Sequence, residues 1–140
     1  MALGLGRDAK GKLLAGIPLF AGLSKKELAQ VASIAEELDF RAGNQLIREG
    51  GPGREFFIVL EGSAEVTRKG KRLAIRKAGD FFGEIALVSD RPRMATVTTL
   101  EPSVMLIVTE TNFRRLVKKS PEIALKVLQA VGERLPADET

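Results

Sequence analysis

The sequence predicts an α+β fold in which helices flank a β-rich middle. Apolar residues recur at helical spacing near both ends of the chain, whereas residues 38–109 form short runs separated by glycine-containing turns. Many short strands at regular spacing are typical of a sandwich or a small barrel. We therefore expect an antiparallel barrel with its helices gathered outside it. No internal repeat or low-complexity linker interrupts residues 1–140, so we expect one domain.

The first 37 residues are predicted to be helical. Residues 10–17 carry leucine and isoleucine at helical spacing, and Pro18 ends this first helix. Ser24-Lys25-Lys26-Glu27 has the pattern of a capping box, in which the Ser24 hydroxyl and the Glu27 carboxylate each accept a hydrogen bond from a free backbone N–H. The apolar residues that follow continue at helical spacing: Leu28, Val31, Ala32, Ala35 and Leu38.

Six runs in the middle of the chain are predicted to be strands. Two of them alternate apolar with polar residues, one through Ala64 and Val66 and the other through Leu73 and Ile75. Turns rich in glycine lie at 49–53, 61–62, 69–70 and 78–80. The predicted strands are 45–48, 55–60, 63–68, 72–76, 95–100 and 104–108.

The chain returns to helix over residues 110–135. Thr109 can cap a short helix that has Lys118 and Lys119 in its last turn, where the helix dipole favours cations. Ser120-Pro121-Glu122 marks a second helix start, with proline at the first helical position. The apolar residues of this last helix form a stripe that we expect to pack in the core: Ile123, Val127, Leu128, Val131 and Leu135.

The composition excludes several classes of function. The chain has no Cys and no His, which excludes thiolate and imidazole metal sites, thiol nucleophiles and histidine acid–base chemistry. No acidic cluster has calcium-loop spacing, and a net charge of +4 is too small and scattered to indicate nucleic acid. No apolar run approaches the ~20 residues that span a bilayer, and residues 1–16 do not resemble a signal peptide. We expect a cytoplasmic protein that needs no cofactor and binds neither nucleic acid nor a membrane.

Residues 79–97 have the pattern of an anion-binding site. Gly83 lets the backbone come close to a ligand, and residues 84–87 can form a helical turn whose free N–H groups bind an anion. An arginine shortly after the turn could complete such a site, because its planar guanidinium can donate two hydrogen bonds to an anion. Arg91 and Arg93 are both candidates for this role, and their chemistry alone does not favour one over the other. Glu84 is an acidic residue at a predicted anion site. It fits a ligand that carries both a phosphate and a hydroxyl, because a carboxylate can accept a hydrogen bond from the hydroxyl. A 3′,5′-cyclic nucleotide has both, since its ribose keeps a free 2′-OH.

This segment resembles a known motif. Phe82-Gly83-Glu84-Ile85-Ala86-Leu87, four further residues and Pro92-Arg93-Met94-Ala95-Thr96-Val97 are similar to the phosphate-binding cassette of cyclic-nucleotide-binding domains. These domains occur in protein kinase regulatory subunits, cyclic-nucleotide-gated channels and bacterial catabolite-activator-type regulators. Residues 17–24 and 47–62 resemble the flanking parts of the same family. The resemblance implies an antiparallel, jelly-roll-like β-roll of about eight strands with an N-terminal helical bundle and C-terminal helices.

The resemblance also implies roles for single residues. Glu84 would bind the ribose 2′-OH, and motif spacing assigns the exocyclic phosphate oxygens to Arg93. Met94 stands where members that favour cyclic GMP often have threonine, so we expect cyclic AMP to be preferred over cyclic GMP. The residues expected to bind the nucleotide, some of them through backbone N–H groups, are Gly83, Glu84, Ile85, Ala86, Arg93, Met94 and Ala95.

In this family the last helix would act as a lid over the purine. The chain has no Trp and no Tyr, so the candidates for the lid are Leu128, Val131, Arg134 and Leu135. Only residues 136–140 follow, too few for a helix-turn-helix, so we expect a non-catalytic sensor that signals to an unidentified effector protein in trans. Two alternatives stay open at this point: a cupin-like barrel enzyme and a structural interaction domain with a degenerate nucleotide pocket.

Overall fold

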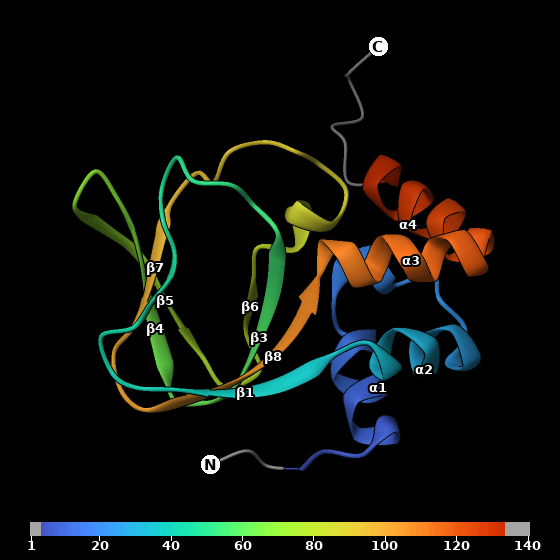
Figure 1. The fold of residues 1–140 in the computed structure, drawn as a ribbon, viewed down its shortest axis with the longest axis horizontal. Helices are drawn as coiled ribbons and strands as arrows, with labels where there is room; N and C mark the ends of the chain where they lie inside the picture. Colours follow the sequence, from blue (N-terminus) through green and yellow to red (C-terminus); the bar gives the residue numbers. More distant parts are fainter. Residues whose placement is uncertain (1–3, 134–140) are drawn as a thin grey trace. The chain divides into compact units, whose positions relative to one another are not determined.

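The computed structural model describes residues 4–133 of the 140-residue chain (Figure 1). Contacts between residues divide it into two compact units. The β unit comprises Ala35–Thr111 together with Gly4, and the helical unit comprises Leu5–Ile34 and residues 112–133. Within residues 4–133, no helix has the length and apolar character needed to cross a membrane. The single domain over residues 1–140 and the cytoplasmic location stay predictions.

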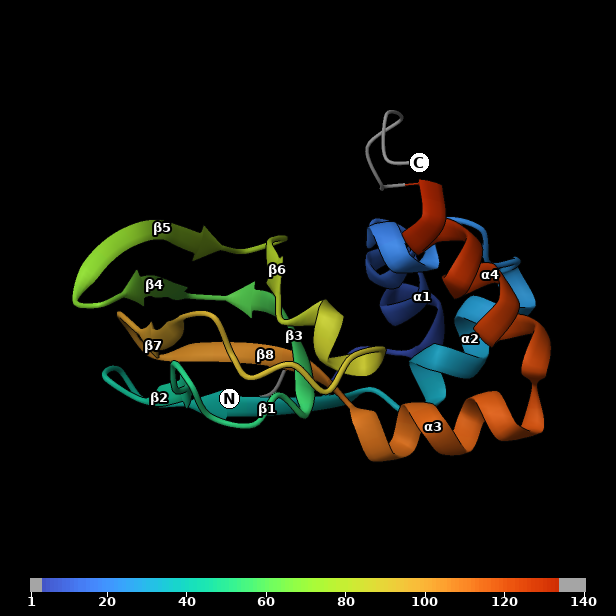
Figure 2. The same cartoon turned by 90° about the horizontal axis from the view of Figure 1, so that it is seen from above.

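The β unit contains eight strands in two antiparallel sheets (Figure 2). In the first sheet the order is β1 (Glu36–Phe40), β8 (Ser103–Thr109), β3 (Glu55–Glu61) and β6 (Phe81–Phe82). In the second sheet the order is β2 (Gln45–Ile47), β7 (Thr96–Thr99), β4 (Ser63–Arg68) and β5 (Lys71–Lys77). This arrangement confirms the predicted α+β fold with about eight antiparallel strands.

Side chains from both sheets meet in the core of the β unit. Strand β8 is buried at its first six positions, and the rings of Phe57 on β3 and Phe82 on β6 stack with centroids 4.9 Å apart. Burial of such apolar surface contributes most of the stability of a unit of this kind. The core cluster consists of Ile47, Phe57, Val59, Ala64, Phe82, Val97, Met105 and Ile107.

The helical unit contains α1 (Arg7–Ala15), a 3₁₀ turn η1 (Pro18–Phe20), α2 (Lys25–Ser33), all but the first two residues of α3 (Glu110–Lys119), and α4 (Pro121–Glu133). The predicted capping box begins α2: the Glu27 N–H donates to Ser24 Oγ at 3.2 Å, and the Ser24 N–H donates to Glu27 Oε1 at 2.8 Å. Glu27 Oε1 also accepts a bond from Lys126 Nζ at 2.6 Å. The same carboxylate therefore caps α2 and ties it to α4.

The helix predicted to continue through Leu38 ends earlier. Helix α2 stops at Ser33, and Leu38 lies in strand β1, where it pairs with Met105 of β8. Ladder bonds to β8 outweigh the helical spacing of the apolar residues here. The strands β1 and β6 were absent from the six predicted from the sequence.

The apolar stripe of α4 also differs from its prediction. The buried residues are Ile123, Val127 and Ala130, which lie four and three positions apart on one face. Leu128 lies about 100° around the helix from Val127 and is 66% exposed, so its assignment to the core was wrong. Val131 is half-buried, and Leu135 lies outside the described residues.

Candidate functional site

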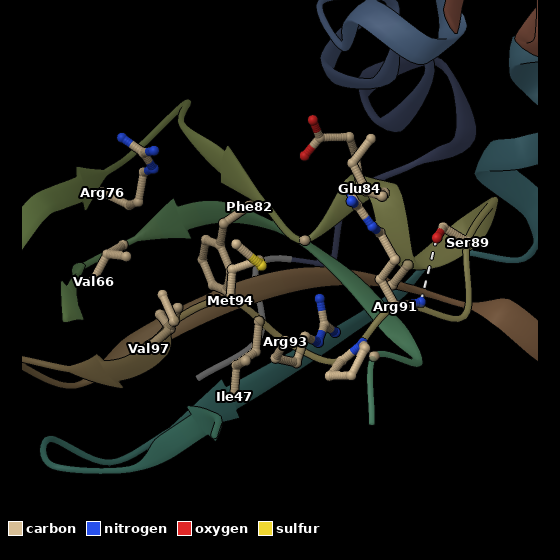
Figure 3. A pocket seen from close by; sticks show the side chains of 16 residues that line it. Ile47, Val66, Arg76, Phe82, Glu84, Ser89, Arg91, Arg93, Met94 and Val97 are labelled. Atoms are coloured by element: carbon tan, nitrogen blue, oxygen red, sulfur yellow. Dashed lines mark hydrogen bonds between the residues drawn. The ribbon is translucent and has the colours of Figure 1, made fainter. Parts of the chain in front are cut away.

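A cavity of about 280 Å³ in the β unit brings together the residues expected to bind a ligand. Its volume is close to the lower end of the range for small-molecule sites. Apolar side chains from several strands form part of its wall, including Ile47, Val66, Phe82 and Val97 (Figure 3). All seven residues assigned from the sequence line this cavity: Gly83, Glu84, Ile85, Ala86, Arg93, Met94 and Ala95.

The cassette begins with a 3₁₀ turn, η2 (Glu84–Leu87). Gly83 precedes it with φ +83°, in the left-handed region that glycine adopts without strain. A Cβ on Gly83 would lie 2.7 Å from Arg93 Nη1 and 2.9 Å from the carbonyl oxygen of Glu55. The Ala86 N–H donates to the Gly83 carbonyl at 3.1 Å, so an anion would meet chiefly the amides that precede Ala86 in the turn.

Arg93 is held in the cavity wall by contacts with the β2–β3 connection. Its backbone forms two hydrogen bonds there: the Gly50 N–H donates to the Arg93 carbonyl at 2.8 Å, and the Arg93 N–H donates to the Gly51 carbonyl at 2.9 Å. Arg93 Nη2 donates to the Glu55 carbonyl at 2.5 Å. A Cβ on Gly53 would lie 3.1 Å from Arg93 Nε. Glycine at both sides therefore leaves space for the guanidinium.

The Arg93 guanidinium is a partly desolvated cation. Burial lowers the pKa of Arg93, and the charge of Glu55 opposes this shift, but an arginine stays protonated under ordinary conditions. Its Nε atom is buried and has no hydrogen-bond acceptor among residues 4–133. A buried donor of this kind is costly for the protein. An anion in the cavity would offset that cost by facing the guanidinium.

Glu84 and Arg91 lie differently from Arg93. The Glu84 side chain is half-buried, and in Figure 3 its carboxylate points away from the Arg93 guanidinium. Arg91 is exposed, and its backbone N–H donates to Ser89 Oγ at 3.3 Å. Of the two arginines, Arg93 is therefore the one packed against the turn, and Arg91 lies at the rim of the cavity.

The residues that line this cavity belong to the β unit. Leu128 and Val131 belong to α4 of the helical unit. Arg134 and Leu135 lie outside the described residues. The lid over the base stays a prediction.

Nine of the residues that line the cavity are not among the seven assigned from the sequence, and two of them, Gly53 and Arg76, lie well before the cassette and carry features that bear on the site. The sequence around Gly53 predicts only a turn, whereas in the structure Gly53 faces Arg93. The alternation of Leu73 and Ile75 predicts that Arg76 lies on the opposite, polar face of its strand. The glycine spacing Gly51-Pro52-Gly53 gave a weak signal for the first, and no sequence pattern gave one for the second.

The chain is similar in sequence to known proteins. The family model described as the cyclic nucleotide-binding domain matches residues 37–120. A cAMP-dependent protein kinase regulatory subunit of Eremothecium gossypii is 35% identical over 111 residues, which cover 79% of this chain and 24% of that protein. The cAMP-dependent protein kinase regulatory subunit of Mycosarcoma maydis is 42% identical over 90 residues, which cover 61% of this chain and 17% of that protein. The chain therefore spans about a quarter or less of these relatives.

Solved structures share the fold. The N-terminal domain of a transcriptional regulator from Streptomyces coelicolor superposes with a TM-score of 0.79 at 29% identity, covering 87% of this chain and 91% of that one. The regulatory domain of Toxoplasma gondii PKA, solved with cAMP, gives a TM-score of 0.68 at 27% identity, covering 88% of this chain and 49% of that one.

Proposed function

The chain belongs to the cyclic nucleotide-binding domain family, and we propose on that premise that it is a sensor that binds cyclic AMP in the cavity beside the η2 turn. The family is regulatory rather than catalytic, so the cupin-like enzyme is not carried further. The curated relatives are named as regulatory subunits that depend on cAMP. These names support cyclic AMP as the ligand to test first.

The observation that carries the proposal is the packing of Arg93. Its guanidinium lines the cavity, is partly desolvated and lies against the turn that begins at Gly83. A planar guanidinium and nearby backbone amides suit a singly charged phosphate diester. Arg93 would bind the exocyclic phosphate oxygens, while the amides near Gly83 and Ile85, which precede that of Ala86, would complete the phosphate site.

Glu84 would bind the sugar. It is the first residue of η2 and lines the same cavity as Arg93. An ionised carboxylate only accepts hydrogen bonds, so it suits a hydroxyl and not a phosphate. The ribose 2′-OH of a 3′,5′-cyclic nucleotide is the group that meets this requirement.

Met94 supports a preference for cyclic AMP over cyclic GMP. It lines the cavity directly after Arg93 and is 65% exposed, so a bound base can reach it. Its thioether has no donor and accepts hydrogen bonds only weakly. The guanine 2-amino group would lose water beside Met94 without a good partner, which costs about 1–3 kcal/mol.

We propose α4 as the element that passes the signal to an effector protein in trans. Two of its leucines, Leu125 and Leu128, are 60% and 66% exposed although they are large and apolar. Burial of these side chains, against either a bound purine or the surface of a partner protein, would lower the free energy. Ligand binding would then favour one position of the helix over another.

Thermal unfolding of the chain with cyclic AMP, cyclic GMP, linear AMP and a cyclic dinucleotide tests the proposal. A ligand at about 100 times its Kd adds about 2.7 kcal/mol, a shift of several degrees for a chain of this size. We expect the largest shift with cyclic AMP. No shift with any of the four would refute the proposal and favour an interaction domain with a degenerate pocket.

A further inference from the structure

Helices α1 and α2 lie side by side in the helical unit, and an open groove runs between them (Figure 1). The volume of this groove is about 850 Å³, about three times that of the cavity beside η2. A smaller hollow of about 300 Å³ shares Arg7, Lys26 and Ala29 with the groove and extends it along α2 to Ser33. The groove shares no lining residue with the nucleotide cavity.

The α1–α2 groove concentrates positive charge. Four cations line it, Arg7, Lys12, Lys25 and Lys26, together with one acid, Asp8, so its net charge is +3. The whole chain carries a net charge of +4. These residues belong to two helices that are separate in the sequence, and the packing of α1 against α2 brings them together. The groove therefore attracts anionic groups more strongly than the composition of the chain indicates.

The protein around the groove does not neutralise these four cations. Within residues 4–133, none of their side chains forms a hydrogen bond or an ion pair. Lys126 on α4 differs, since its Nζ lies 2.6 Å from Glu27 Oε1. Arg7, Lys25 and Lys26 also stand in the first turns of their helices, where the helix dipole disfavours cations. Electrostatics within the helices therefore does not account for these residues, whereas an anionic partner would.

The rest of the groove lining is small or apolar. Gly11 and Ala15 lie four positions apart on α1, and Leu28 and Ala29 come from α2. A Cβ on Gly11 would meet no heavy atom within 4 Å, so the space beside this glycine is open. Glycine inside a helix is less stable than alanine, but it lets the backbone of a neighbour come close. Such a lining suits a compact element with small side chains.

We propose that the α1–α2 groove docks an acidic amphipathic helix of a partner protein. Glu and Asp side chains of that helix would face the four cations, and its small apolar residues would cover Gly11, Ala15 and Leu28. Each wall helix has nine residues, about 13 Å, which matches two to three turns of a partner helix.

Two other anionic partners fit the groove less well. A lipid surface is flat, so it would meet the cations without covering the recessed apolar lining. A nucleic acid would gain little beyond its phosphate contacts, because no aromatic side chain lines the groove among the described residues and bases have nothing to stack on. An acidic helix is the partner that satisfies both the charge and the apolar lining.

Fluorescence anisotropy of a labelled peptide, titrated with the whole chain, tests this docking site. The probe is a synthetic peptide of Glu, Ala and Leu, about 20 residues long so that it forms a helix in water, and the control peptide has Gln in place of every Glu. The acidic peptide should bind at least about tenfold more tightly and should lose affinity as salt rises from about 0.05 M to about 0.3 M. Lys26→Glu should weaken its binding about fivefold. Lys71→Glu changes the net charge equally at an exposed position of β5 and should leave binding unchanged.

Gly11→Gln separates filling of the groove from loss of the fold. Glutamine is a better helix former than glycine, so thermal unfolding should show a Tm that rises by a few degrees. The glutamine side chain should occupy the open space of the groove and weaken peptide binding about tenfold. A variant that is more stable but binds less cannot owe its weaker binding to unfolding.

Three results would overturn the docking site: equal affinity for the two peptides, equal effects of Lys26→Glu and Lys71→Glu, or full binding by Gly11→Gln. Sedimentation with phosphatidylserine vesicles completes the test, and binding to the vesicles without binding to the acidic peptide would assign the groove to a membrane surface instead. These measurements contain no nucleotide, so their outcome is independent of the proposed cyclic-nucleotide site.

Discussion

Replacing Arg93 with alanine should remove most ligand affinity while leaving the β unit folded. The substitution deletes the hydrogen bond from Nη2 to the Glu55 carbonyl, which contributes about 1.5–3 kcal/mol for a charged donor. It also removes a partly buried cation whose Nε has no acceptor within the described residues, which offsets part of that loss. The backbone bonds between residue 93 and Gly50–Gly51 do not depend on the side chain. A net cost of about 1–2 kcal/mol is small beside the usual stability of a domain.

The loss of affinity should be much larger than the loss of stability. A charge-assisted hydrogen bond contributes about 1.5–3 kcal/mol, and a guanidinium that binds a phosphate through two N–H groups forms two of them. One terminal nitrogen of Arg93 already donates to the Glu55 carbonyl, so we use the lower value of about 1.5 kcal/mol for each of the two bonds, or about 3 kcal/mol in total. This corresponds to an affinity loss of roughly a hundredfold.

Calorimetric titration with cyclic AMP measures the effect. The control is Arg91→Ala, which removes an exposed arginine from the rim of the same cavity and should change the Kd by less than about fivefold. Arg93→Lys should fall between, because lysine keeps the charge but not the planar pair of donors. If Arg93→Ala and Arg91→Ala weaken binding equally, the assignment of the phosphate to Arg93 is wrong.

Four further outcomes are expected. Glu84→Gln should reduce the preference for cyclic AMP over its 2′-deoxy analogue in competition binding, and an unchanged preference would remove Glu84 from the sugar site. Met94→Thr should raise the affinity for cyclic GMP relative to cyclic AMP in the same assay; an unchanged ratio would exclude Met94 as a determinant. The hydrogen bond from Lys126 lowers the pKa of Glu27 below its ordinary value of 4.5. The ionised Glu27 carboxylate therefore contributes its full stabilisation above about pH 4.5, and this stabilisation is lost as the pH falls through the pKa of the folded state. Urea unfolding between about pH 3 and about pH 6 should therefore show a steeper acid loss in the wild type than in Glu27→Gln, and equal slopes would contradict this. Cyclic AMP should increase hydrogen-exchange protection across residues 124–133; protection that rises only at residues 83–87 would place the lid elsewhere.

Features that depend on neighbours in the sequence were predictable. The capping box joins Ser24 and Glu27, three positions apart, and both of its hydrogen bonds are present. The turn after Gly83 likewise lies where the cassette pattern placed it. Such features are set by a few consecutive residues, so a sequence pattern is sufficient to find them.

Features that depend on distant partners were not predictable. Strand β1 exists because it pairs with β8, some 70 residues later, and the helical spacing of its apolar residues gave the opposite signal. Gly53 matters because it faces Arg93, forty positions away. The direction of Arg76 depends on its register against Ala64, which the alternation on β5 alone could not fix.

The expected selectivity of the cavity follows from the cost of an unsatisfied polar group. Beside Met94 the guanine 2-amino group would lose water and find no good partner, which costs about 1–3 kcal/mol. Adenine has no amino group at this position, so it does not incur that cost. The wild type should therefore prefer cyclic AMP over cyclic GMP by roughly tenfold to a hundredfold.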